Sequence, residues 1–174
     1  MKSNTRNLVL ASLFAAIIMI FTSCVKVNTG INEGYLHFGD SMIYLAACLL
    51  PTPYAMGAAA VGGALADIMA GAPVWAPATA IIKALNALPF ALIYLTPFVK
   101  NKQKILCIPT VLMTIVSGLI TIFGYLIAET IMFTFESACA SALIGIVQAT
   151  GSAVIFCIAA AALDCAKFKT RLCK

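Results

Sequence analysis

Charged residues are scarce in this chain. Asp, Glu, Lys and Arg make up 10% of its 174 residues, whereas 63% are hydrophobic, and the mean hydropathy is +1.05. A soluble globular protein needs more polar side chains than this to cover its surface. The composition therefore excludes a soluble protein and predicts an integral membrane protein in contact with a lipid bilayer.

Motifs for catalysis and metal binding are also lacking. The chain has one histidine and therefore no HExxH, and it has no GxSxG, no GxxxxGK[ST] and no CxxC among its seven cysteines. Composition leaves open a Ser or Cys nucleophile with His37 as its base, but little else supports hydrolysis. We predict that the chain is not an enzyme, has no catalytic residue, metal or cofactor, and uses its cysteines as reduced packing residues.

The basic residues are grouped at the ends and the middle of the chain. Eleven Lys and Arg stand against six Asp and Glu. Three clusters flank the apolar runs, and they comprise Lys2 and Arg6, then Lys100, Lys102 and Lys104, then Lys167, Lys169, Arg171 and Lys174. This is the pattern of cytoplasmic segments in membrane proteins rather than a nucleic-acid-binding patch. We predict that both termini are cytoplasmic and that no nucleic acid is bound.

The apolar runs predict six transmembrane helices in one domain that covers residues 1–174. At about 20 residues per crossing, the expected helices are residues 8–24, 38–50, 54–70, 78–99, 109–133 and 139–163. The fold class is an all-α integral membrane protein with a six-helix bundle. The second helix is short, so helices two and three could instead form a re-entrant hairpin. The segment at 25–36 predicts either a short β-hairpin over a cavity or a plain connector.

The N-terminal 24 residues permit a second interpretation. A basic start, an apolar core and Thr22-Ser23-Cys24 are similar to a bacterial lipoprotein signal that is cleaved before Cys24. Phe21 fits that cleavage site poorly, and the following sequence is itself apolar. We therefore interpret this segment as the first helix, in which Ala11 and Ala15 form a flat face that permits close helix packing.

Polar residues within the apolar runs are concentrated in the predicted outer half of the membrane. His37 and Asp40 begin the second helix, Asp67 and Glu129 lie near outer helix ends, and Gln148 is near mid-membrane. The inner half has almost no polar residues, whereas an open pore needs polar lining along its length. The distribution predicts a cavity that opens outward and is closed below.

Spacing joins some of these residues into patches. Lys83 with Asn86, and Tyr125 with Glu129, lie on one helix face each and are expected to point into the bundle. A purely structural role is also open to each candidate. The structural role open to Lys83 is an ion pair that neutralises Asp67 or Glu129, without ligand contact. For the remaining candidates, the structural roles are a helix cap for Asp40, interhelical hydrogen bonds for Asn86 and Gln148, a solvated tip for His37, and an interfacial anchor for Trp75.

Three segments carry a resemblance to a known family. They are Gly34-Tyr35-Leu36-His37-Phe38-Gly39-Asp40, Ala64-Leu65-Ala66-Asp67, and Trp75-Ala76-Pro77-Ala78-Thr79 followed by Ile81-Ile82-Lys83. This pattern resembles the S components, or substrate-binding subunits, of energy-coupling factor (ECF) vitamin transporters. The branch it resembles is riboflavin-type and includes members for pyridoxine, hydroxymethylpyrimidine and queuosine precursors. Gly124, Tyr125, Glu129 and Gln148 are weaker matching points.

The resemblance implies a multi-pass protein of a prokaryotic plasma membrane that captures a small vitamin-like ring compound from outside. Its partners would be a transmembrane coupling subunit and two ATP-binding subunits. The family's helix-one alanine motif carries a docking role onto Ala11 and Ala15. The expected substrate-binding set is Lys83, Glu129, Tyr125, Gln148, His37, Asn86, Asp67 and Trp75. The ligand would be pyridoxine or hydroxymethylpyrimidine, then riboflavin or a queuosine precursor; the alternative is a self-sufficient channel or proton-coupled carrier.

Overall fold

The fold is a helical bundle with one small β-hairpin, and a computed structural model describes residues 2–32, 35–96, 99 and 104–172. Its helices are α1 (Lys2–Ser23), α2 (Asp40–Leu49), α3 (Thr52–Ala70), the 3-10 turn η1 (Pro73–Trp75), α4 (Ala76–Ile93), α6 (Ile108–Met132), α7 (Phe135–Cys165) and α8 (Phe168–Leu172). Strands β1 (Lys26–Asn28) and β2 (Tyr35–His37) form the hairpin.

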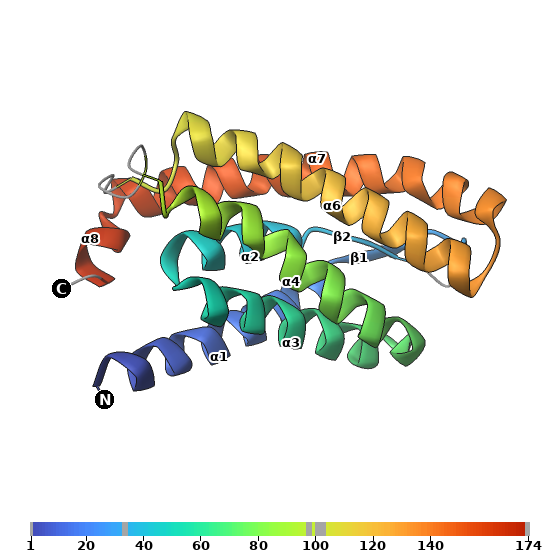
Figure 1. Ribbon diagram of the computed structural model, residues 1–174, viewed down its shortest axis with the longest axis horizontal. Helices are drawn as coiled ribbons and strands as arrows, with labels where there is room; N and C mark the ends of the chain where they lie inside the picture. The colour runs from blue at the N-terminus through green and yellow to red at the C-terminus, as the bar shows by residue number, and fades with distance from the viewer. Residues whose placement is uncertain (1, 33–34, 97–98, 100–103, 173–174) are drawn as a thin grey trace.

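The helices form two layers along the long axis of the molecule (Figure 1). The α6–α7 pair makes one layer, α1 and α3 make the other, and α4 contacts both α3 and α6. The short α2 is almost completely buried between them. Both termini lie at one end of the bundle, and the hairpin loop, η1 and the α6–α7 turn lie at the other.

Local sequence signals explain several helix ends. Pro53 and Pro109 stand in the first turns of α3 and α6, where a missing N–H costs nothing. Gly71 ends α3 with φ of 87°, a left-handed conformation that favours glycine. Thr134 caps α7 by accepting a hydrogen bond from the Ser137 N–H at 3.3 Å, which explains why α7 begins before residue 139.

The flat alanine face of α1 is used for packing inside this chain. Ala11 and Ala15 are each 8% exposed and belong to the apolar core. The facing residue on α3 is Gly62, where a Cβ atom would lie 2.6 Å from the Ala15 carbonyl oxygen. The structure thus places Ala15 directly against α3 and buries Ala11 in the core, so that neither alanine lies on the open surface.

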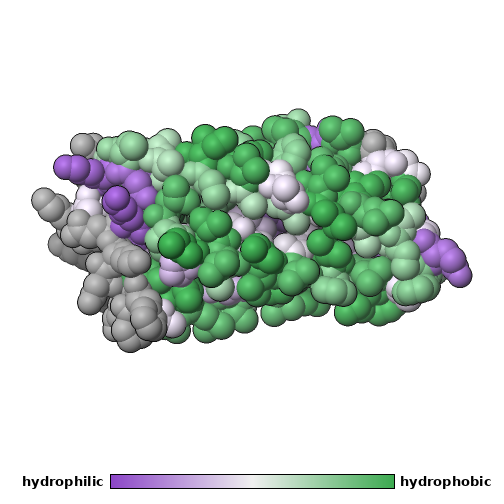
Figure 2. Space-filling view, turned by 90° about the horizontal axis from the view of Figure 1, so that it is seen from above, coloured by the Kyte–Doolittle hydropathy of each residue, from purple (hydrophilic) through white to green (hydrophobic). Residues whose placement is uncertain are grey.

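The outer surface is that of a membrane protein. Four segments of the described chain are long and apolar enough to cross a bilayer, namely Asn4–Ser23, Pro73–Ile93, Ile108–Met132 and Phe135–Cys165. Figure 2 shows a broad apolar surface between hydrophilic residues at the two ends of the long axis. Helix α3 has 19 residues and α2 has ten, and neither is among the four segments.

The structure decides two of the open sequence questions. Lys26 pairs with His37, and Asn28 with Tyr35, in an antiparallel ladder, so the expected β-hairpin is confirmed and the plain connector is excluded. Helix α4 ends at Ile93 instead of residue 99. Residues 97–98, Gly34, Lys100, Lys102 and Lys174 lie outside the described residues.

Candidate ligand-binding site

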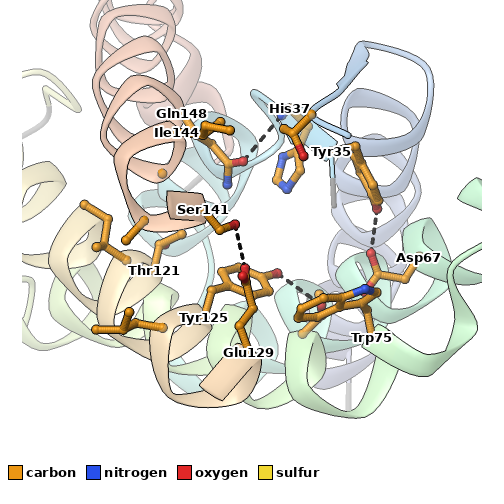
Figure 3. A pocket seen from close by; sticks show the side chains of 16 residues that line it. Tyr35, His37, Asp67, Trp75, Thr121, Tyr125, Glu129, Ser141, Ile144 and Gln148 are labelled. Atoms are coloured by element: carbon orange, nitrogen blue, oxygen red, sulfur yellow. Dashed lines mark hydrogen bonds between the residues drawn. The ribbon is translucent and has the colours of Figure 1, made fainter. Parts of the chain in front are cut away.

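A polar cavity lies between the hairpin and the ends of α3, α4, α6 and α7, in the half of the bundle away from the termini (Figures 1 and 3). The space between its atoms, including the open solvent at its mouth, is about 680 Å³. Its lining comprises Thr29, Tyr35, His37, Asp67, Trp75, Thr79, Thr121, Ile122, Tyr125, Leu126, Glu129, Ser141, Ala142, Ile144, Gly145 and Gln148.

A buried ion pair lies beneath this cavity. The Lys83 Nζ donates to Asp40 Oδ1 at 2.6 Å, and the two side chains are 1% and 0% exposed. Asp40 Oδ2 accepts longer hydrogen bonds from Gln148 Nε2 at 3.4 Å and Thr121 Oγ1 at 3.5 Å. A buried carboxylate needs both a countercharge and donors. The pair therefore lies behind Thr121 and Gln148, which form the floor of the cavity, and it orients the Gln148 amide.

Lys83 and Asp40 therefore differ from what the sequence suggested. The partner of Lys83 is neither Asp67 nor Glu129, and Lys83 is not among the residues that line the cavity. Asp40 makes no capping hydrogen bond, although it is the first residue of α2. Gly63 on α3 leaves room for the lysine, because a Cβ atom there would lie 2.9 Å from Lys83 Cγ.

His37 is held in one orientation beside Gln148 in the cavity wall. Its main-chain N–H donates to Gln148 Oε1 at 3.4 Å, and its Nδ1 accepts from the Gly39 N–H at 3.2 Å. Its ring points into the cavity and is 4% exposed (Figure 3). Burial, with the nearby Lys83 charge, lowers the pKa of His37 to about 3. The ring is therefore neutral, with its proton on Nε2.

This depressed pKa predicts a pH-dependent stability. The folded pKa lies below the unfolded value of about 6.5, so the unfolded chain binds more protons as pH falls from 6.5 towards 3. His37 should cost about 2 kcal/mol of stability at pH 5 relative to pH 7.5. Thermal unfolding of purified His37→Gln should show a correspondingly weaker pH dependence. An unchanged dependence in that variant would contradict a neutral, buried His37.

Glu129 fastens the hairpin loop to the α6–α7 turn. Its Oε2 accepts from Asn32 Nδ2 at 2.7 Å, and its Oε1 accepts from the Ser141 hydroxyl at 2.7 Å. Asn32 also donates to the Ser137 hydroxyl at 3.2 Å, and its φ of 50° is a left-handed conformation that asparagine tolerates. The loop between β1 and β2 is thus held against the cavity wall by charge-assisted hydrogen bonds.

Asp67 forms the opposite side of the cavity in Figure 3. The Tyr35 hydroxyl donates to Asp67 Oδ1 at 2.5 Å, while Asp67 Oδ2 is buried without a hydrogen bond from any described residue. Trp75 packs on Phe133 at a ring distance of 5.8 Å and meets the edge of Tyr125 at 6.1 Å. The site therefore combines two carboxylates with aromatic walls.

Six of the eight predicted binding residues line one cavity, and they are His37, Asp67, Trp75, Tyr125, Glu129 and Gln148. Lys83 and Asn86 are buried outside its lining. Sequence reasoning missed the other ten lining residues, of which five carry a hydroxyl group, namely Thr29, Tyr35, Thr79, Thr121 and Ser141. Spacing could have indicated two of them, because Thr121 precedes Tyr125 and Glu129 at four-residue intervals and Ser141 lies two turns before Gln148.

Two comparisons with known proteins bear on this site. The family described as ECF-type riboflavin transporter, S component, matches residues 2–164 of this chain. A protein of Pyrococcus woesei, described as an uncharacterized protein in gap 3'region, is 30% identical over 138 residues. That match covers 79% of this chain and 88% of the Pyrococcus protein.

Proposed function

Because the chain belongs to the family of ECF-type riboflavin transporter S components, we propose that its outward cavity captures a small vitamin-like heterocycle for ATP-driven uptake by partner subunits. Members of this family are multi-pass plasma membrane proteins that bind vitamin-type substrates and are not enzymes. The finer assignments that follow, namely topology, substrate and docking surface, are proposals for this chain.

The observation that carries the proposal is a polar cavity that is closed on one side. The elements that line it meet in the half of the bundle opposite the two termini (Figure 1). The basic clusters predict that the terminal end is cytoplasmic, so the cavity lies in the outer half of the bundle. The Lys83–Asp40 pair is buried behind Thr121 and Gln148, which form the cavity floor. A buried ion pair behind the floor favours a binding subunit over a self-sufficient channel or proton-coupled carrier.

We also propose six passes with both termini in the cytoplasm. Two termini at the same end require an even number of crossings. The 19 residues of α3 extend about 29 Å at 1.5 Å per residue, close to the roughly 30 Å hydrocarbon thickness. The ten residues of α2 reach only about half as far. Because α2 is enclosed by other helices, it can remain short without exposing its ends to lipid.

Ligand choice follows from the groups that line the cavity. His37, Gln148, Glu129 and several hydroxyl groups provide directed hydrogen bonds, and Trp75 and Tyr125 provide aromatic walls. This combination suits a compact heteroaromatic with polar substituents. We therefore retain pyridoxine or hydroxymethylpyrimidine as the favoured ligands, followed by riboflavin or a queuosine precursor.

The proposed partners are an ECF transmembrane coupling subunit and two ATP-binding subunits. The docking role that the resemblance places on Ala11 and Ala15 must act through helix α1, yet both residues are buried within this chain, with Ala15 against α3. The outward face of the same turns carries Ser12, Leu13 and Ala16, which are exposed. We propose that this exposed face of α1 contacts the coupling subunit, while Ala11 and Ala15 set the distance between α1 and α3.

One experiment tests capture and coupling together. Purified protein in detergent should show a thermal shift with at least one ligand from a panel of B vitamins and queuosine precursors, and Trp75→Ala should weaken that binding about tenfold or more because it removes an aromatic wall. Liposomes containing this chain alone should not accumulate the ligand, whereas addition of the coupling and ATP-binding subunits should permit ATP-dependent uptake.

The controls separate the parts of this proposal. Ala16→Trp should retain ligand binding and lose uptake, whereas Val61→Trp, at an exposed position of α3, should retain both. Uptake by liposomes with this chain alone would show a self-sufficient carrier. Absence of a thermal shift with every ligand of the panel would contradict vitamin capture.

A further inference from the structure

The cavity lining has an uncompensated negative charge. Asp67 and Glu129 both line it, and no Lys or Arg is among the described residues that do. His37 is neutral because its Nδ1 accepts a hydrogen bond from Gly39. The charge of Lys83 is balanced by Asp40 beneath the floor. Within the described chain, neither of these two carboxylates forms an ion pair with a Lys or Arg, and the Lys83 charge that acts on Asp67 is shared with Asp40.

The two carboxylates differ in how well they are satisfied. Each oxygen of Glu129 accepts a 2.7 Å hydrogen bond, from Asn32 and from Ser141. Asp67 is 4% exposed, and its Oδ1 accepts from Tyr35, but its Oδ2 has no hydrogen bond within the described chain. The Thr79 hydroxyl lies close enough to Asp67 to act on its carboxylate, but its 3.0 Å hydrogen bond is with the Tyr125 hydroxyl. A buried carboxylate oxygen without a donor is costly, so Asp67 Oδ2 marks the position that a ligand donor would fill.

Aromatic side chains surround the same space. Tyr35, Trp75 and Tyr125 all line the cavity, and Figure 3 shows the Trp75 ring between Asp67 and Glu129. The faces of aromatic rings attract cations through their quadrupole, and tryptophan and tyrosine rings are the usual walls of sites for ammonium groups. The protein already uses this interaction below the floor, where Lys83 Nζ lies 5.2 Å from the Tyr125 ring centroid.

We propose that the ligand of this cavity is a small aromatic compound with a protonated amine, which the Asp67 carboxylate binds as an ion pair. This inference rests on the proposed capture of a small heterocycle, and within that class it favours amine-bearing compounds over neutral ones such as pyridoxine and riboflavin. The amine donates to Asp67 Oδ2, the aromatic part of the ligand packs on Trp75, and Glu129 adds a second negative charge on the other side. Neutral and anionic rings bind less well because they leave Asp67 unbalanced.

Matched probes that differ only at the amine test this proposal. The pairs are benzylamine with benzyl alcohol, pyridoxamine with pyridoxine, and 7-aminomethyl-7-deazaguanine with 7-cyano-7-deazaguanine. Binding to the purified full chain is measured by calorimetry at pH 7.5, where the aliphatic amines are protonated. In each pair that binds, we expect the amine to bind at least tenfold more tightly than its neutral counterpart.

Two variants test whether the preference for the amine arises from the carboxylates of the cavity. Asp67→Asn should reduce the preference to less than threefold, because the amide has the same shape but no charge. Glu136→Gln removes an exposed carboxylate in the first turn of α7, outside the cavity, and should leave the preference unchanged. If Asp67→Asn does not fold, Glu129→Gln replaces it and should lower the preference at least threefold.

The outcomes separate this inference from the proposed function. Equal or tighter binding of the neutral members, or binding of riboflavin with no amine preference, would overturn the inference and leave ligand capture standing. A full amine preference in a folded Asp67→Asn variant would also overturn it, as would a full preference in Glu129→Gln if Asp67→Asn does not fold. If neither these probes nor the vitamin panel binds, the proposed function fails and this inference fails with it.

Discussion

Replacement of Lys83 by methionine should lower the free energy of unfolding by about 3–5 kcal/mol, the usual cost of removing one member of a buried ion pair. Asp40 is 0% exposed and would keep its carboxylate without a countercharge, supported only by the long hydrogen bonds from Gln148 and Thr121. Denaturant unfolding of the purified protein in detergent measures this loss. Lys26→Met removes an exposed lysine and should change stability by less than about 1 kcal/mol.

A double variant separates a structural role of Lys83 from ligand contact. Lys83→Met with Asp40→Asn removes both charges and keeps an amide that can bond to Gln148 and Thr121, so it should recover most of the lost stability. Because Lys83 does not line the cavity, the double variant should also retain ligand affinity within about tenfold. A stable double variant with no ligand binding would instead restore Lys83 to the binding set. A loss below about 1 kcal/mol in the single variant would contradict the buried pair.

Replacement of Glu129 by alanine should weaken ligand binding by about 100-fold and should also lower the unfolding midpoint. The variant loses two charge-assisted hydrogen bonds, each typically worth about 1.5–3 kcal/mol, and releases Asn32 in the hairpin loop from α6. Calorimetric titration with the ligand found in the panel measures the affinity. Hydrogen exchange of the β1 and β2 amides should become faster, because the loop that covers the cavity loses its attachment.

The effect of the Glu129 charge can be measured separately from the effect of its hydrogen bonds to Asn32 and Ser141. In Glu129→Gln, the amide oxygen can still accept from Asn32 and its NH₂ group can donate to Ser141, so hairpin exchange should stay close to that of the unmodified protein. Glu136→Ala, at an exposed position of α7, should change neither affinity nor exchange. If Glu129→Ala leaves both affinity and hairpin exchange unchanged, Glu129 neither anchors the hairpin nor contributes to the site.

Much of the architecture was predictable from apolar and turn-forming residues. Long apolar runs predicted the helices, because in a bilayer the backbone must satisfy its own hydrogen bonds. Gly30 and the alternating residues around it predicted a possible hairpin, which the β1–β2 ladder confirms. Helix ends were less predictable. The Thr134 cap extends α7 towards its N-terminus, and such capping by one hydroxyl leaves almost no trace in hydropathy.

The candidate site was predictable as a set of residues but not as a set of pairs. Helical spacing joined Tyr125 with Glu129, and both line the cavity. The same reasoning left Lys83 with Asp67 or Glu129 as its partner, whereas the structure pairs it with Asp40. Asp40 precedes Lys83 by 43 residues. Local spacing carries no information about a contact between two different helices.

Composition and hydropathy alone were enough to identify a membrane protein without the motifs of an enzyme, whose buried polar residues gather in one half of the bundle. They carry that information because each residue's transfer into lipid has its own cost. Which charges cancel and which remain became known only from the packed helices. Lys83 neutralises Asp40, whereas the carboxylates of Asp67 and Glu129 line the cavity. Ala15 packs against α3 inside the chain. That outcome depends on how α2, α4 and α6 approach one another, since Coulomb and hydrogen-bond energies act over a few ångströms in space.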